Sequence, residues 1–464
     1  MKTDNLWLKY TEEDMTKVKE VCDRYKQCLD NGKTERECVS QVVKMAQQQG
    51  YRELHSVIEQ GGRPVAGDKL YAVQMDKSVV LFQMGKKPVS QGMRILGAHI
   101  DSPRIDVKQN PLYESDGFAY LDTHYYGGIK KYQWTTIPLA LHGVAVKKDG
   151  TVVRISIGEK DDDPVFVITD LLIHLAGEQM AKKADVVITG EKLDLLIGNR
   201  PLKQSEEEDK EAVRANILKL LSECYGIEEE DFLSADLEIV PAGKARDLGF
   251  DKSMILAYGH DDRVCAFTSV FAMFDLAGEV TDHTLCCILA DKEEIGSVGA
   301  TGMASQFFEN TIAELVAAAE RESQLLVRRA LANSKMLSSD VSAGFDPLYA
   351  DAYEKKNAAF LARGLAFNKY TGSRGKRGSS EANAEYVAEI RRIMDDAGVM
   401  YQFSELGKVD AGGGGTIAHL LAEYGMNVID SGVSVLNMHA PWEIISKVDL
   451  YEALLGYEAF FREA

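Results

Sequence analysis

The sequence predicts an α/β protein with a second, β-rich domain inserted into the first. Several apolar runs end abruptly at acidic or imidazole side chains, which is typical of buried strands in a parallel sheet. The clearest of them is LCCILADKEEIGSVG, at 285–299. The 464 residues exceed what one hydrophobic core usually supports. Between 105 and 248 the pattern changes to short β-prone runs separated by turn residues, which predicts the insertion.

The first hundred residues are expected to form two helices and then three strands. Thr11 and Thr34 each have an acidic residue three positions later, the spacing of a capping box, and they predict helices over 12–30 and 35–49. The apolar runs YAVQM, SVVLFQM and RILGAHI then predict strands, and the last of these runs contains His99.

The insertion at 105–248 is expected to contain short strands and an acidic helical tract, SEEEDKEAVRANILKLLSECYG. After it, the alternation of strand and helix resumes, so that 1–104 and 249–464 form one domain. The expected elements of this second half are strands at 253–259, 284–290, 401–405 and 427–430, a short strand ending at Asp340, and helices at 264–277, 311–333, 380–397 and from 447.

Composition excludes several classes of partner and location. The formal net charge is -19, which argues against nucleic acid and anionic membranes, because both require a basic surface. Seven scattered cysteines are typical of buried thiols in a reducing compartment. The N-terminus has no secretory pattern and no apolar run is long enough to span a bilayer, so we expect a cytoplasmic protein.

Acidic and imidazole side chains recur at the ends of apolar runs, each followed by small or turn-forming residues: His99, Asp261, Glu293 with Glu294, Asp340 and His439. Carboxylate and imidazole without thiolate suit a catalytic site for zinc, cobalt or manganese. The set is large enough for two metals that share a bridging carboxylate. The extra glutamate can then act as general base, since it lies beside a ligand.

Some of these positions also have ordinary interpretations. Asp340 could be a helix N-cap. Asp101 could be a turn residue, although a carboxylate two positions after His99 can also hold the tautomer of that imidazole. A single histidine at a strand end is more often a core or surface residue than a ligand.

Five segments, in chain order, resemble the metal-binding motifs of the aspartyl aminopeptidase family of cocatalytic zinc metallo-aminopeptidases: GAHIDSPRI, GHDDRVCAF, DKEEIGSVGATG, SSDVSAG and MHAPWEI. The resemblance covers essentially the whole chain. It implies a zinc-exopeptidase-like α/β/α sandwich and a β-rich oligomerisation domain. It also implies that His99 and Asp340 hold one metal, that Glu294 and His439 hold the other, and that Asp261 bridges them.

The resemblance assigns roles to further residues. Glu293 would be the general base and Asp101 would orient His99, while Asp262 remains an alternative to its neighbour Asp261 as the bridge. His174, in ITDLLIHLAG, matches a histidine that reaches the active site of a neighbouring subunit in this family. The alternative is a core histidine. The family also implies a homo-oligomer, possibly a tetrahedral dodecamer.

The preferred substrate is left open by the sequence. The segments HDDR and MHAPWE differ from those of eukaryotic family members, and HDDR also resembles related aminopeptidases of the glutamyl type. A pocket for an acidic N-terminal residue needs a cation, for which the candidates are Lys369, Arg374 and Lys376. Two other functions are considered: a related zinc-dependent carboxypeptidase or amide deacylase, and a non-catalytic peptide-binding assembly.

Overall fold

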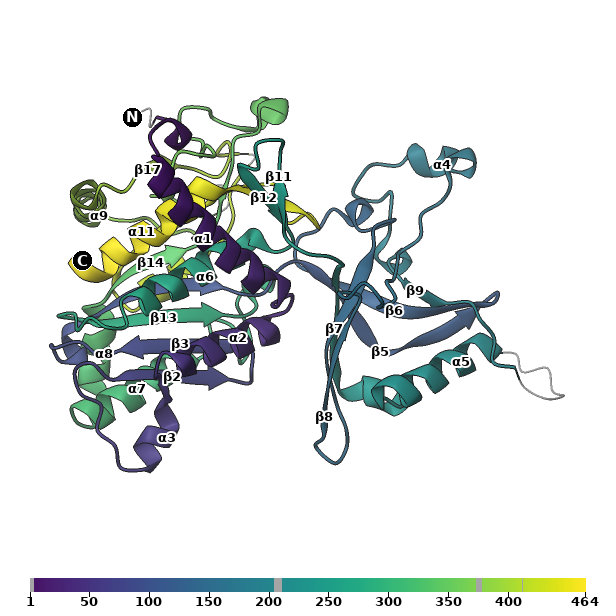
Figure 1. Cartoon of the computed structure of the whole chain (residues 1–464), viewed down its shortest axis with the longest axis horizontal. Coiled ribbons are helices and arrows are strands. Elements are labelled where there is room, and N and C mark those ends of the chain that lie inside the picture. The colour runs from purple at the N-terminus through teal and green to yellow at the C-terminus, as the bar shows by residue number, and fades with distance from the viewer. Residues whose placement is uncertain (1–3, 204–210, 373–377, 411) are drawn as a thin grey trace. The chain divides into compact units, whose positions relative to one another are not determined.

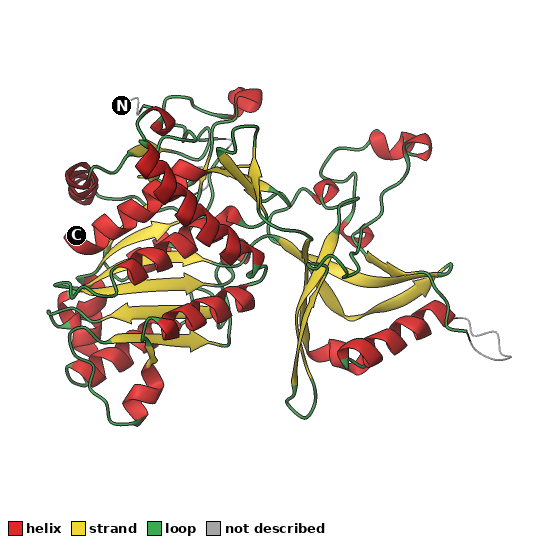
Figure 2. Ribbon diagram, viewed as in Figure 1, coloured by secondary structure: helices red, strands yellow, loops and turns green. Residues whose placement is uncertain are grey.

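The computed structural model describes residues 4–203, 211–372, 378–410 and 412–464, which form two compact units (Figures 1 and 2). The first unit contains Met1–Asp101, Ala245–Met438 and Glu443–Ala464, and the second contains Ser102–Lys244 and His439–Trp442. The chain therefore leaves the first unit once to build the second, and a short segment near the C-terminus joins the second unit again.

The first unit is built on a nine-stranded mixed sheet with the order β1-β2-β3-β13-β4-β14-β18-β16-β17. At its centre β4 lies parallel between β13 and β14, so the C-terminal ends of these three strands share one edge. Antiparallel pairs flank them, between β13 and β3 and between β18 and β16. The strands are Arg52–Glu53, Lys69–Gln74, Ser78–Gln83, Thr284–Ala290, Met93–His99, Lys335–Ser339, Asn427–Gly432, Leu365–Asn368 and Tyr401–Ser404, in sheet order.

Helices cover both faces of this sheet. Successive side chains of its buried strands point to opposite faces, so each strand contributes to the hydrophobic clusters on both sides. In β4, Leu96 packs in one hydrophobic cluster and Ile95 packs in the other. The first cluster includes α1 (Glu12–Asp30), α2 (Glu35–Gln48), α6 (His260–Asp275), α9 (Ala384–Ala397) and α11 (Lys447–Glu463). The second includes α3 (Leu54–Glu59), α7 (Phe307–Ala319), α8 (Gln324–Ala332) and α10 (Ala418–Ala422).

A five-stranded sheet completes the first unit, with the order β11-β12-β20-β19-β15. Its strands are Arg246–Leu248, Met254–Ala257, Glu443–Ser446, Ser434–Leu436 and Ser342–Ala343. The antiparallel register of β12 and β20 pairs Ala257 with Glu443, which brings a buried carboxylate close to the start of α6.

The second unit is a six-stranded antiparallel sheet with the order β8-β7-β10-β5-β6-β9. Helix α5 (Ala212–Leu220) packs along β5, β6 and β9 and continues into a π-helical turn at Leu221–Tyr225 (Figure 1). The strands are Val152–Ile157, Leu139–Val146, Ala235–Pro241, Arg104–Ser115, Phe118–Tyr126 and Leu195–Gly198. The acidic run SEEEDK, at 205–210, lies outside the described residues.

Both predicted capping boxes are confirmed, since Thr11 and Thr34 cap α1 and α2. The single helix predicted over 311–333 is wrong, because the chain breaks between α7 and α8. There the Glu320 carboxylate accepts hydrogen bonds from the amide and hydroxyl of Ser90. The hydroxyl of Ser323 then caps the start of α8.

The seven cysteines are all free thiols, and only Cys224 is exposed. No helix in the described part of the chain combines the length and apolar character needed to cross a bilayer.

Candidate metal centre

Three of the predicted site segments lie side by side because they follow adjacent parallel strands. His99 is the last residue of β4, Asp291 to Glu294 follow β13, and Asp340 follows β14. Open α/β sheets place their functional groups beyond the carboxyl ends of such strands. The next element after Asp340 is the strand β15, so the alternative that Asp340 caps a helix is wrong.

The imidazole of His99 is buried among carboxylates. Its Nδ1–H donates to the carbonyl oxygen of Asp101 at 3.0 Å, while Oδ1 of Asp261 lies 3.2 Å from Nε2. In the neutral ring this tautomer leaves the lone pair on Nε2, the nitrogen that would bind a metal. Burial opposes protonation, but contacts with Asp101 and Asp261 raise the pKa of His99 well above its usual value.

The carboxylate of Asp101 shapes the turn that carries the two glutamates. Its two oxygens accept the backbone amides of Glu293 at 3.1 Å and Glu294 at 3.2 Å, and Oδ1 lies 3.4 Å from Nδ1 of His99. Lys292 adopts a left-handed conformation just before this turn, with φ 68°. One buried aspartate therefore joins the end of β4 to the segment after β13.

Asp261 and Asp262 directly follow His260, the first residue of helix α6, and are both buried. The amide of Asp261 donates to Oε2 of Glu443 at 2.9 Å. The preceding His260 bonds the hydroxyl of Tyr25 through Nδ1 at 2.8 Å, and burial lowers the pKa of His260 to about 3. The sequence analysis assigned no role to Glu443. The feature that could have indicated one is the position of this acidic residue directly before two isoleucines, in the segment EII.

Two overlapping groups of side chains could hold a metal ion. In each group, one ligand atom per residue lies within 4.8 Å of the others: His99, Asp261 and Glu294 form the first group, and His99, Asp262 and Asp340 form the second. Both aspartates of the HDDR segment therefore lie near His99, and the choice of a bridging residue between Asp261 and Asp262 stays open.

Cations suit this cluster because its carboxylates are buried close together. Burial and the neighbouring aspartates raise the pKa values of Asp262 and Asp340 well above their usual range. Oδ1 of Asp262 is buried and accepts no hydrogen bond from any described residue. A divalent metal would neutralise the carboxylates and give such oxygens a partner, and the oxygen and nitrogen donors match zinc.

His439 lies in the segment that clusters with the second unit. It has φ 66°, and its Nδ1–H donates to the carbonyl oxygen of Gly128 at 2.9 Å. The bond fixes the same tautomer as in His99 and again leaves the lone pair on Nε2. The role of His439 as a ligand stays a prediction.

The remaining predicted residues are not members of this cluster or lie outside the described residues. His174 is exposed on a short 3-10 helix, Ile173–Leu175, in the second unit, so within one chain it is not a core histidine. Lys369 lines a different groove, in the first unit. Arg374 and Lys376 lie outside the described residues.

Comparison with known proteins decides the family. Residues 28–461 match the family model described as aminopeptidase I zinc metalloprotease (M18). The chain belongs to the M18 family of zinc metallo-aminopeptidases. It is 57% identical to a probable M18 family aminopeptidase 1 of Clostridium acetobutylicum, over 98% of this chain and 97% of that protein. A probable M18 family aminopeptidase 1 of Thermotoga maritima is 41% identical, over 100% of this chain and 99% of that protein.

Solved M18 structures share the fold. The crystal structure of the Thermotoga maritima M18 aminopeptidase superimposes with a TM-score of 0.93, at 41% identity and full coverage of both chains. Aminopeptidase I from Clostridium acetobutylicum gives 0.92, at 55% identity and 99% coverage of each chain. A more distant structure, the S. cerevisiae mApe1 dodecamer, has a TM-score of 0.75 at 19% identity, covers 95% of each chain, and shows the fold alone.

Proposed function

We propose that this M18 aminopeptidase hydrolyses the N-terminal peptide bond of peptides at a two-metal centre on a zinc-exopeptidase-like α/β/α domain. The observation that carries the proposal is the cluster of the buried His99 and Asp261 with the half-buried Glu294, with Glu293 adjacent on the same turn. A peptide-binding scaffold would not need a metal-ligand cluster with a general base beside it.

The metal ligands follow from the cluster and from the family. His99 and Asp340 would hold one metal, Glu294 and His439 would hold the other, and Asp261 would bridge them, with Asp262 as the alternative bridge. The proximity of Asp261 to both His99 and Glu294 supports the bridging assignment. Zinc is the expected metal because the family model is that of a zinc metalloprotease, with cobalt and manganese as alternatives.

Of the two neighbouring glutamates, Glu293 acts as the general base. When bound, the two metals would lower the pKa of a water molecule and polarise the substrate carbonyl. Glu293 accepts the proton of the attacking water and delivers it to the leaving amine. Asp101 holds the backbone of both glutamates and orients His99, as its hydrogen bonds with the Glu293 and Glu294 amides support.

The active site is completed by a neighbouring subunit, and the second unit mediates this assembly. His174 donates a hydrogen bond to the developing oxyanion of the neighbour's substrate. Large apolar side chains surround it: Ile173 and Leu175 are each 68% exposed, and Leu171 and Leu172 are also exposed. Exposed apolar patches of this kind mark interaction surfaces. A dodecamer, as described for S. cerevisiae mApe1, is the proposed assembly.

An acidic N-terminal residue is the proposed preference, with Lys369, Arg374 and Lys376 as the cations that would hold its side chain. The test is a panel of Asp, Glu, Leu, Lys and Ala p-nitroanilides on enzyme stripped with a chelator and re-metallated with zinc, cobalt or manganese. N-acetylated substrates serve as controls, because an aminopeptidase needs the free amine.

Cleavage of only the Asp and Glu substrates after re-metallation would support the whole proposal. Cleavage of neutral substrates would support the aminopeptidase activity but reject the proposed pocket for an acidic residue. Cleavage of the N-acetylated controls would favour the carboxypeptidase or deacylase chemistry instead, and no cleavage with any metal would reject the catalytic proposal for this chain.

A further inference from the structure

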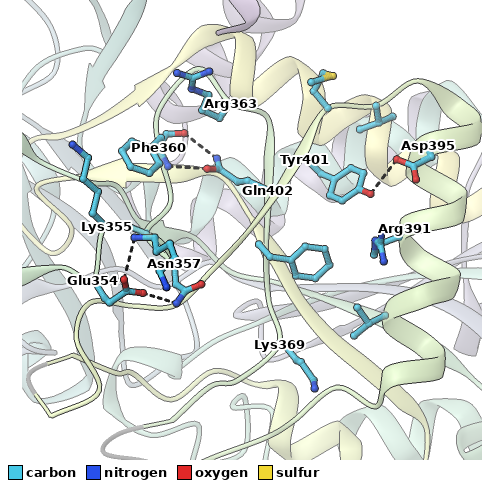
Figure 3. Close-up of a pocket in the computed structure, with 16 residues that line it drawn as sticks. Glu354, Lys355, Asn357, Phe360, Arg363, Lys369, Arg391, Asp395, Tyr401 and Gln402 are labelled. Carbon is cyan, nitrogen blue, oxygen red and sulfur yellow. Dashed lines mark hydrogen bonds between the residues drawn. The ribbon is translucent and has the colours of Figure 1, made fainter. Parts of the chain in front are cut away.

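We propose that a groove along the outer strand β17 binds an extended, acidic peptide segment. The groove has a volume of about 1230 Å³ and lies within the first unit (Figure 3). Its walls are helix α9, the chain from Glu354 to Phe360, and β17 with the residues just before it.

The free edge of β17 provides backbone hydrogen-bonding groups. β17 is the outermost strand of the sheet and pairs on one side with β16 in parallel, with Leu365 opposite Tyr401. The Leu365 amide donates to the carbonyl of Met400 at 3.0 Å. In a parallel pair this register directs the N–H and C=O groups of Tyr401 and Phe403 away from β16. An added strand could hydrogen-bond with them.

Just beyond the C-terminal end of β17, a neighbouring segment of the chain already hydrogen-bonds along this edge. The amide of Glu405 donates to the carbonyl oxygen of Asn357 at 2.7 Å. The side chain of Gln402 bridges to both the amide and the carbonyl of Phe360, at 2.9 Å each (Figure 3). These bonds hold the 354–360 segment in place beside the strand, so it forms one fixed wall of the groove.

Apolar side chains form part of the lining. Val387 projects from α9, and Met400 and Phe403 come from β17 and the residue before it; all three are half-buried. The Tyr401 hydroxyl donates to Asp395 at 3.0 Å, which anchors the strand to α9. A peptide in the groove would therefore cover apolar surface as well as pair with the backbone.

The charged side chains of the groove select for an acidic occupant. Five of the lining residues are cationic, Lys355, Lys356, Arg363, Lys369 and Arg391, and two are acidic, Glu354 and Asp395. Both acids accept hydrogen bonds within the protein, from Asn357 and from Tyr401. The groove is therefore net positive on a chain whose formal charge is -19. Carboxylates of a bound segment would complement it.

An acidic peptide fits these observations better than a second copy or a small anion. Symmetric pairing of β17 with β17 of another copy would bring the same cations together, a recognised way to prevent edge pairing. A small anion would leave the apolar lining and the strand edge unused. Figure 3 shows Lys355 and Arg391 on opposite sides of the groove.

The test is fluorescence polarisation with a fluorescein-labelled peptide of alternating glutamate and valine, N-acetylated and C-amidated so that an aminopeptidase cannot shorten it. Arg391→Glu is expected to weaken binding about tenfold, because it reverses a charge in the groove. The matched control is Arg392→Glu on the same helix, since Arg392 does not line the groove and instead pairs with Asp396 at 3.2 Å. This control should bind like the wild type.

Two further probes define the mode of binding. The same peptide with lysine in place of glutamate, and one N-methylated at alternate residues, should both fail to bind, because they lack the charge and the strand hydrogen bonds respectively. Equal binding of either probe would overturn the proposal, as would unchanged binding by Arg391→Glu with a normal melting temperature. Absence of binding together with a smaller oligomer for Arg391→Glu would show that a second copy occupies the groove, which also overturns it.

Discussion

At the scale of single residues, backbone carbonyls orient the histidines of the candidate metal centre. His99 and His439 each donate Nδ1–H to a backbone carbonyl, of Asp101 and Gly128 respectively. Each imidazole therefore has its lone pair on Nε2, the nitrogen proposed to bind a metal. Sequence spacing identified the side chains of this cluster, but it could not show which carbonyl sets each tautomer, because those contacts depend on the folded backbone.

Asp101 gives the first prediction at this scale. In Asp101→Asn the side-chain NH₂ group would face the amide of either Glu293 or Glu294, so one of the two hydrogen bonds would be lost. We expect turnover or zinc affinity to fall about 10- to 100-fold, the usual effect of removing a residue that orients metal ligands. Steady-state kinetics and zinc titration measure both quantities. Asp106→Asn, which alters a carboxylate bonded to Arg104, is the control. Wild-type kinetics in Asp101→Asn would refute the positioning role.

At the scale of elements, the pattern of apolar runs ending in acids or histidine was enough to predict the strands that build the site. β4, β13 and β14 each end where the run ends, and their parallel register brings those ends together. The capping boxes of α1 and α2 could be predicted equally well, because their contacts join residues only three positions apart in the sequence.

Contacts between residues distant in the sequence could not be predicted from the sequence. Glu443 reaches the amide of Asp261 only because β20 pairs with β12, and nothing local marks that pairing. The break between α7 and α8 was missed, and there Ser90, distant in sequence, bonds Glu320.

Gly432 offers a prediction about how strands position the site. A Cβ atom on this residue of β18 would lie 1.9 Å from the carbonyl oxygen of Asp340 and 3.1 Å from the Cys265 sulfur. Gly432→Ala should therefore displace Asp340 and lower the free energy of unfolding by about 1–3 kcal/mol. Thermal melting and metal analysis test this together. Gly278→Ala is the control, because its added Cβ would meet no atom within 4 Å. Equal melting temperatures for the two variants would contradict the expected clash.

At the scale of the whole molecule, the exposed apolar segment around His174 supports the proposed assembly. The β-rich insertion was visible in the sequence as a change of pattern, but the return of residues 439–442 to that unit was not.

Assembly can be tested by placing a charge in the exposed segment. Ile173→Asp should lower the molar mass measured by light scattering and reduce turnover, because a buried unpaired carboxylate would destabilise the interface. Leu8→Asp, at a residue 84% exposed in the first unit, should leave both unchanged. A full-size, fully active Ile173→Asp enzyme would argue against a role of this segment in assembly.

The measurement that tests the central claim most directly compares Glu293→Gln with Glu294→Gln, two identical changes at adjacent residues of one turn. Zinc content and turnover are measured on both. We expect Glu293→Gln to keep its zinc and lose about 10²- to 10⁴-fold in turnover, as for removal of a general base. Glu294→Gln should lose zinc. Wild-type turnover in Glu293→Gln, or loss of zinc from that variant while Glu294→Gln retains it, would contradict the assignment.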